Sequence, residues 1–136
     1  MGDRKKEVCM RGHTMTHSEF NSYQGIILTK AVGMGATKGK EYSNSESRFA
    51  NFDRIAEELG FTNIQVAWVY TKKHLDGIAS FCRTQKEFSE PIEGRIVDAI
   101  VYLTLIAGMI EEKRGRTQKN SVQEQYSPTQ TTKSNF

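Results

Sequence analysis

The longest apolar run of the chain is "IVDAIVYLTLIAGMI", residues 96–110, and Asp98 is the single charged residue within it. A membrane-spanning helix needs about 20 predominantly apolar residues, so this run predicts a buried core helix instead. An ionised carboxylate that is buried without a partner costs several kcal/mol. Asp98 therefore predicts a partner, and three kinds fit: a metal ion, a lysine or arginine of another helix, or His74. An ion pair that only stabilises the fold satisfies the same pattern.

Apolar residues also recur at helical spacing earlier in the chain, and no stretch between residues 14 and 112 alternates convincingly as a half-buried strand would. A first helix is expected to begin after Thr16, with Phe20, Tyr23 and Ile27 on one face. A second is expected within residues 47–60 and should stop at Gly60.

Residues typical of helix N-termini precede each of the last two expected helices. Thr62 and Gln65 have the spacing of a capping box, which predicts a third helix that begins directly after Thr62. Ser89 or Glu90 is expected to cap the fourth helix, which would continue to residue 111 or 112. Together the four patterns predict an all-α fold, a bundle of four to five helices.

Length and composition indicate one domain. The 136 residues carry a net charge of +3, which permits contact with nucleotides or nucleic acids without requiring it. Two widely separated cysteines give neither a disulfide framework nor a zinc site, so a cytoplasmic location is expected. We expect residues 1–14 to be a flexible extension, residues 15–112 to be the helical domain, and the polar residues 113–136 to be a disordered tail.

The stretch "VGMGATKGKEYS", residues 32–43, resembles a phosphate-binding loop only superficially. In a P-loop the Gly-Lys pair is followed by Ser or Thr, and another glycine stands five residues before the pair. Here Glu41 follows Gly39 and Lys40, and Met34 occupies the earlier position. The glycines therefore predict a helix end or a turn between helices.

The third expected helix carries cations and aromatic rings close together. Lys72, Lys73 and His74 follow Trp68 and Tyr70 by about one helical turn. Such a surface suits a phosphate group and a base that stacks on a ring. Solvated lysines beside core or rim aromatic residues give the same pattern, so both interpretations stay open.

Three segments carry a resemblance to a known family: "KGKEYSNSESRFANF" (38–52), "AWVYTKKHLDGI" (67–78) and "EPIEGRIVDAIVYLTLI" (90–106). In this order they resemble the helical, largely phage-encoded proteins described as nucleotide-modification-associated. Those proteins are similar to the MazG-like all-alpha nucleoside triphosphate pyrophosphohydrolases. The similarity covers residues 19–112.

The resemblance implies a MazG-like helical fold that forms a homo-oligomer, usually a dimer, in the cytoplasm of a phage-infected host cell. It implies that Mg²⁺ binds to acidic side chains and that a nucleotide or nucleotide-derived small molecule binds to the metal through its phosphates. The residues it assigns to metal binding and catalysis are Glu41, Glu90 and Asp98. Those it assigns to substrate binding are Lys38, Tyr42, Arg48, Asn51, Lys73, His74 and Tyr102.

Two departures bear on catalysis. Gly94 stands where the family commonly has an acidic residue, and Val101 stands where it has a polar amide; both adjoin Asp98 on the helix surface. Because Mg²⁺ relies on one or two carboxylates besides the substrate phosphates, losing one weakens its binding. Three functions therefore stay open: a Mg²⁺-dependent nucleoside triphosphate pyrophosphohydrolase, a non-catalytic nucleotide binder that sequesters, for example, a signalling nucleotide, and a helical interaction module.

Overall fold

A computed structural model describes residues 12–42 and 47–125, with the backbone alone for Tyr42 and for residues 116–125. The described residues form four helices and no strand: α1 (His17–Tyr42), α2 (Ala50–Leu59), α3 (Asn63–Thr84) and α4 (Ile92–Gln125). The expected all-α fold is confirmed. Within the described residues, no helix combines the length and the apolar character that crossing a membrane requires.

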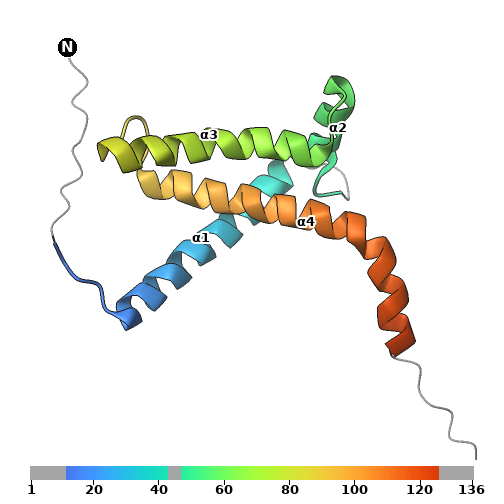
Figure 1. Cartoon of the computed structure of the whole chain (residues 1–136), viewed down its shortest axis with the longest axis horizontal. Helices are drawn as coiled ribbons and strands as arrows, with labels where there is room; N and C mark the ends of the chain where they lie inside the picture. The colour runs from blue at the N-terminus through green and yellow to red at the C-terminus, as the bar shows by residue number, and fades with distance from the viewer. Residues whose placement is uncertain (1–11, 43–46, 126–136) are drawn as a thin grey trace, which may run out of the picture.

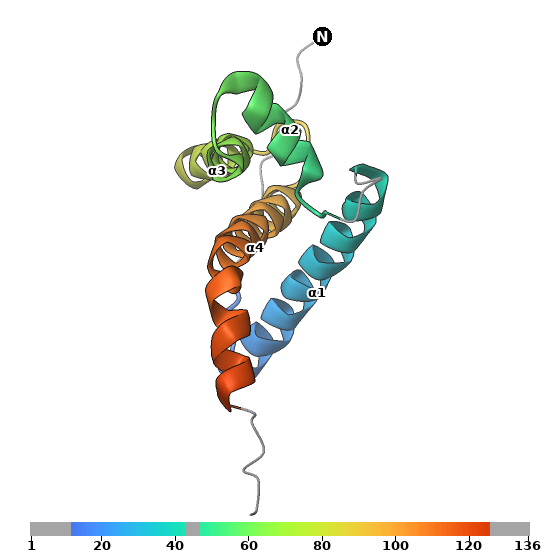
Figure 2. The ribbon, with the colours of Figure 1, turned by 90° about the vertical axis from the view of Figure 1, so that its right-hand side faces the viewer.

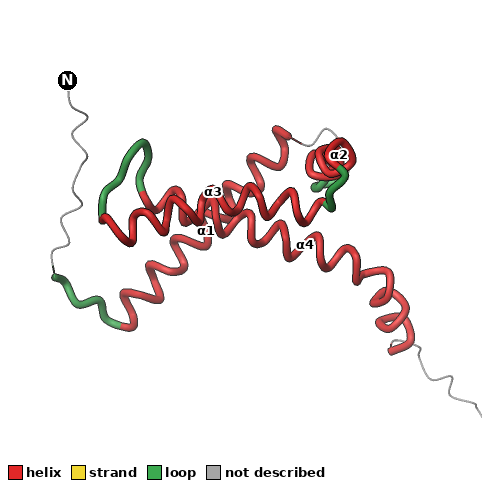
Figure 3. Tube along the Cα trace, turned by 45° about the horizontal axis from the view of Figure 1, so that its top comes forward, coloured by secondary structure: helices red, strands yellow, loops and turns green. Residues whose placement is uncertain are grey.

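Helix α4 is the central element of the fold. It lies antiparallel to α3 along most of the length of that helix, and α1 crosses α4 obliquely, as Figures 1 and 2 show. The short helix α2 packs on α3, and Figure 3 shows the loop that joins the two helices. The fold is therefore an α3–α4 pair with α2 at one end and α1 across it.

Two apolar clusters hold these helices together. The first joins α2, α3 and α4 and includes Phe52, Ala67 and Met109. The second joins α1 to α4 through Ala31, Val97 and Val101, with Ile27 and Met34 packed against it. Val97 and Val101 lie within the apolar run on which the expectation of a core helix rested.

Local signals fix the junction between α2 and α3 as expected. Gly60 ends α2 in the left-handed conformation, with φ 71°, which glycine adopts without steric cost. The Thr62 hydroxyl accepts a hydrogen bond from the Gln65 backbone N–H, and the Gln65 side chain accepts one from the Thr62 N–H. The expected capping box is confirmed.

The glycine-containing stretch at 32–43 agrees with one of its two expected structures, a helix end, because α1 ends there at Tyr42. Residues 33–42 continue α1 without a turn, so the other alternative, a turn between helices, is wrong for these residues. Single glycines each lower helix stability by about 0.5–1 kcal/mol, and packing against α4 and Arg48 offsets that loss here. Helix α1 consequently carries Lys38 as far as Asp98 of α4.

Both ends of α4 also differ from the sequence-based expectation. The Glu87 carboxylate, not Ser89 or Glu90, caps the helix by accepting a hydrogen bond from the Ile92 N–H at 2.9 Å. At the other end α4 continues to Gln125, whereas the fourth helix was expected to end at residue 111 or 112. Polar residues such as Lys, Arg, Gln and Glu are good helix formers, so polarity alone does not end a helix. Residues 126–136 lie outside the described part.

Candidate functional site

Asp98 lies where three helices meet. Its side chain, on α4, is 16% exposed, and its Oδ1 accepts a hydrogen bond from the Lys38 Nζ of α1 at 3.3 Å. Its Oδ2 lies 3.7 Å from the His74 Nδ1 of α3. Two of the partner types expected for this carboxylate, a lysine of another helix and His74, are therefore beside it. The contact links segments that are 60 residues apart in the sequence.

The contact between Asp98 and His74 is not a salt bridge at neutral pH. Burial lowers the pKa of His74 below its ordinary value of 6.5, and this effect exceeds the opposing attraction of the Asp98 carboxylate. The His74 side chain is only 12% exposed. Its Nδ1 is buried and has no hydrogen-bond partner among the described residues. His74 thus contributes a neutral imidazole whose ring faces and Nδ1 lie next to the carboxylate.

Aromatic rings surround this point. Tyr102, one turn after Asp98, stacks on the His74 ring with centroids 5.3 Å apart. Its ring also lies parallel to that of Tyr70, with a centroid distance of 5.9 Å and an interplanar angle of 3°. Phe52 meets both tyrosine rings edge-on, at 6.1 Å and 6.4 Å. The result is an aromatic wall, because Phe52, Tyr70 and Tyr102 each contact at least two other rings.

A cleft of about 280 Å³ opens beside this wall. All four helices and the residues just before α2 contribute to it. Its lining consists of Lys38, Arg48, Asn51, Phe52, Tyr70, Asp98, Val101, Tyr102 and Leu105. The structure therefore brings five of the ten predicted site residues into one cleft, with His74 directly behind Tyr102.

Arg48 enters the cleft by crossing the glycine stretch of α1. Its Nη2 donates a hydrogen bond to the Gly35 carbonyl at 3.3 Å. A Cβ at position 39 would stand 2.8 Å from the Arg48 Nε, closer than real Cβ contacts allow. Gly39 therefore lets the guanidinium lie against the helix backbone. The stretch forms a helix and not a phosphate-wrapping loop, and Gly39 makes room for a cation.

Asn51 has one of its two polar atoms committed. Its Oδ1 accepts a hydrogen bond from the Arg54 Nη2 at 2.9 Å. The amide nitrogen is thus the group that this side chain retains for a ligand. Together with Lys38 and Arg48, it gives the cleft three hydrogen-bond donors, facing the single Asp98 carboxylate.

Four predicted residues lie elsewhere. Glu41 borders an open groove between α1 and the start of α4. The Glu90 Oε1 lies 3.4 Å from the Arg95 Nη2. Lys73 is exposed on α3, and its charge helps lower the His74 pKa. Tyr42 is the last residue of α1, and its side chain lies outside the described part.

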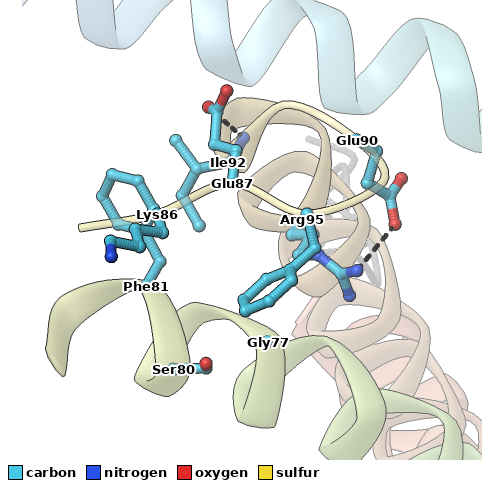
Figure 4. A pocket seen from close by; sticks show the side chains of 9 residues that line it. Gly77, Ser80, Phe81, Lys86, Glu87, Glu90, Ile92 and Arg95 are labelled. Carbon is cyan, nitrogen blue, oxygen red and sulfur yellow. Dashed lines mark hydrogen bonds and ion pairs between the residues drawn. The ribbon is translucent and has the colours of Figure 1, made fainter. Parts of the chain in front are cut away.

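Glu90 belongs to a second, smaller cavity of about 150 Å³ between the end of α3 and the start of α4. Figure 4 shows Arg95 reaching from α4 toward Glu90, with Gly77 and Phe81 of α3 below it. A Cβ at Gly77 would stand 2.7 Å from the Arg95 Nη1, so this arginine also lies against a helix backbone. Glu90 is therefore held away from the main cleft by its own cation.

The donor set does not fit a preformed Mg²⁺ site. Among the described residues, no three side chains of His, Cys, Asp or Glu gather closely enough to hold a metal ion. Asp98 already has the Lys38 ammonium on Oδ1, and Gly94 offers no carboxylate one turn earlier. Glu41 and Glu90 line other cavities. The positive charge at the carboxylate is supplied by the chain itself.

Sequence reasoning gave Phe52 and Leu105 no role in the site and considered Val101 only as a departure from the family pattern, although all three line the cleft. They belong to apolar faces of α2 and α4, and helical spacing cannot distinguish a core position from the wall of a cleft. The sequence pattern indicates Tyr70 as a site residue because it stands near two lysines and His74. The same pattern indicates Trp68, which does not line the cleft and is 49% exposed.

Comparison of the chain with protein-family models, with curated proteins and with solved structures found no match. The resemblance to the MazG-like proteins consequently stays a prediction from the three sequence segments.

Proposed function

We propose that the cleft binds a nucleotide or a nucleotide-derived small molecule. The observation that carries this proposal is the parallel pair Tyr70 and Tyr102 in the same cleft as Lys38 and Arg48. Flat aromatic surfaces recognise a base by stacking, and cations recognise a phosphate by charge. The same combination is what the sequence resemblance to nucleotide-modification-associated proteins implies.

Tyr70 is the ring on which a base would stack. It is 40% exposed, whereas Phe52 is 7% exposed and is already occupied by its two edge-on contacts. Base stacking on an aromatic side chain contributes about 1–3 kcal/mol, and a hydrogen bond to a charged group about 1.5–3 kcal/mol. One of each sums to about 2.5–6 kcal/mol before the entropic cost of association, so these two contacts alone predict a Kd no tighter than about 40 μM.

Lys38 and Arg48 would meet the phosphate. Lys38 is 48% exposed, so its ammonium can contact a ligand while it remains paired with Asp98. Arg48 is half-buried against α1 and presents a guanidinium whose fork geometry suits phosphate oxygens. Because the chain provides these cations, binding should not require a divalent metal ion. This favours the non-catalytic nucleotide binder among the three functions that the sequence left open.

Isothermal titration calorimetry with a nucleoside monophosphate and with its nucleoside, each with and without EDTA, tests the proposal. We expect the monophosphate to bind in both conditions and the nucleoside to bind more weakly. Tyr70→Leu should weaken binding at least about tenfold through lost stacking. Trp68→Leu is the matched control, because it removes an exposed aromatic residue of the same helix outside the cleft. Absence of binding, or equal effects of the two substitutions, would reject the proposal.

Hydrolysis of a nucleoside triphosphate is the second candidate. A carboxylate that is 16% exposed beside two cations favours it, and the resemblance implies it with Mg²⁺ as cofactor. The described positions of Glu41 and Glu90 argue against it, since neither reaches Asp98. Pyrophosphate release with Mg²⁺ that disappears in Asp98→Asn would establish hydrolysis. A homo-oligomer is part of either proposal.

A further inference from the structure

The Asp98 carboxylate keeps most of its hydrogen-bonding capacity unused within the protein. Among the described residues, the Lys38 ammonium is the one donor within hydrogen-bond distance, at 3.3 Å from Oδ1. The His74 Nδ1 lies 3.7 Å from Oδ2 and makes no hydrogen bond to any described residue. A carboxylate has about four lone-pair sites, so about three stay without a donor from these residues. A ligand in the cleft can supply the missing donors.

The surroundings of this carboxylate strengthen the hydrogen bonds that it accepts. The face of α4 that lines the cleft consists of Asp98, Val101, Tyr102 and Leu105. Asp98 is the single charged residue of these four, and Val101 beside it is 7% exposed. Apolar surroundings make a hydrogen bond to a charged group stronger than it is in water. A neutral donor is therefore favoured at Asp98, whereas a phosphate would meet a charge of its own sign.

The position of Asp98 indicates which part of a nucleotide supplies that donor. Tyr102, one turn further along α4, is stacked with Tyr70, the ring on which the base lies in the proposed function. Lys38, one of the two cations for the phosphate, is in direct contact with the carboxylate. In a nucleotide the sugar joins the base to the phosphate, whereas the hydrogen-bonding edge of the base points away from the phosphate. The group that lies against Asp98 is therefore the sugar.

The size of the cleft and the chemistry of sugars make this placement selective. The cleft measures about 280 Å³, close to the lower limit of about 300 Å³ for ligand pockets, so the parts of one nucleotide must lie against adjacent walls. Ribose offers two neighbouring hydroxyl donors to the two oxygens of a carboxylate, and 2′-deoxyribose offers only one of them. An acidic residue that accepts a hydrogen bond from a ribose hydroxyl is a known means of sugar recognition in dinucleotide-binding folds.

We propose that the cleft selects ribonucleotides over deoxyribonucleotides, with the Asp98 carboxylate accepting hydrogen bonds from the 2′- and 3′-hydroxyl groups of ribose. The inference rests on the proposed nucleotide binding and specifies the class of nucleotide. Lys38 positions the carboxylate through its contact with Oδ1 and meets the phosphate with its exposed side. The carboxylate that lacks the companions for a Mg²⁺ site thus recognises the sugar.

Titrations of the natural chain with matched ligands test the selectivity. The adenosine, guanosine, cytidine and uridine 5′-monophosphates are each compared with their 2′-deoxy and 3′-deoxy counterparts, in EDTA, by calorimetry or ligand-detected NMR. For the base that binds most tightly, we expect each deoxy ligand to bind at least about tenfold more weakly, as the loss of one hydrogen bond to a charged group predicts. Equal affinities would overturn the inference and leave nucleotide binding intact. Absence of binding by every ligand would reject the proposed function and the inference together.

Two substitutions assign the selectivity to Asp98. Asp98→Asn keeps the size of the side chain and removes its charge, so the affinity ratio of ribose ligand to 2′-deoxy ligand should fall to about threefold or less. Arg48→Met removes a cation of the same cleft and should weaken both ligands while the ratio stays. Because each ratio compares two ligands on one variant, a general loss of affinity cancels. A ratio that Asp98→Asn leaves unchanged would overturn the inference. Circular dichroism checks the fold, and if Asp98→Asn does not fold, the natural-chain titrations decide.

Discussion

The two halves of α1 carry similar residues and meet different surroundings. Residues 27–41 pack on α4 and send Lys38 to Asp98, while residues 17–26 have their apolar side chains in solvent. Both halves contain large or branched apolar residues at helical spacing. The comparison shows that apolar residues at helical spacing indicate a packing surface but do not indicate whether the same chain covers it.

The largest difference between a packed and an exposed position of α1 should come from two neighbouring residues. Ala31 is 6% exposed and packs with Val97 and Val101, whereas Val32 is 74% exposed. Ala31→Glu buries an unpaired carboxylate between α1 and α4 and should lower the free energy of unfolding by about 3 kcal/mol or more. Val32→Glu should change it by less than about 0.5 kcal/mol. Urea unfolding monitored by circular dichroism measures both, and equal losses would contradict the packing described.

A second contrast concerns the lysines at the packed end. Lys38→Met removes the cation beside Asp98 and should weaken monophosphate binding about tenfold, as the loss of one charged hydrogen bond predicts. Lys40→Met removes an exposed charge that does not line the cleft. Calorimetry of the two variants should show the loss for Lys38→Met alone. Similar losses would mean that only the general positive charge of α1 matters.

The pH dependence of stability should be a smaller effect, and it should come from His74 of α3, which lies beside Asp98. The His74 pKa is lowered by burial, so below 6.5 the unfolded chain binds more protons than the folded chain. The contribution of this group is therefore fully present above pH 6.5 and is lost as the pH falls through the lowered pKa. Unfolding midpoints measured from pH 7 to pH 5 should fall more for the natural chain than for His74→Gln. The same slope in both would show that other groups cause it.

The smallest effect distinguishes two glycines of the same helix. At Gly25 nothing lies within 4 Å of the place that an alanine Cβ would take, whereas a Cβ at Gly39 would meet the Arg48 Nε at 2.8 Å. Gly25→Ala should stabilise the fold by about 0.5–1 kcal/mol through helix propensity. Gly39→Ala should gain less and should weaken ligand binding, because Arg48 must shift. Thermal unfolding and calorimetry check the pair, and an unchanged affinity in Gly39→Ala would show that binding does not depend on the position of Arg48.

Local signals in the sequence predicted much of the fold. Thr62 with Gln65 and the stop at Gly60 act within a few residues, so the junction between α2 and α3 could be read directly. The path of α1 through Gly33 and Gly39 could not, because the side chains that pack along that stretch come from α4 and from Arg48, beyond the stretch itself. Glycine marks both turns and close approach, and only tertiary structure separates the two.

The part of the site around Asp98 could be predicted because a charged residue does not suit an apolar helix. A carboxylate at this position predicted a partner, and Lys38 and His74 lie beside it. The grouping of Glu41 and Glu90 with Asp98 came from the resemblance, and the described fold keeps the three apart. Arg95 holds Glu90 in the second cavity, a contact that depends on the close packing of α3 on α4 at Gly77.

The ion pair between Lys38 and Asp98 lines the cleft and also joins α1 to α4. A phosphate that shares the Lys38 ammonium with Asp98 would weaken that contact. Occupancy of the cleft would then alter how firmly residues 27–41 of α1 are held against α4.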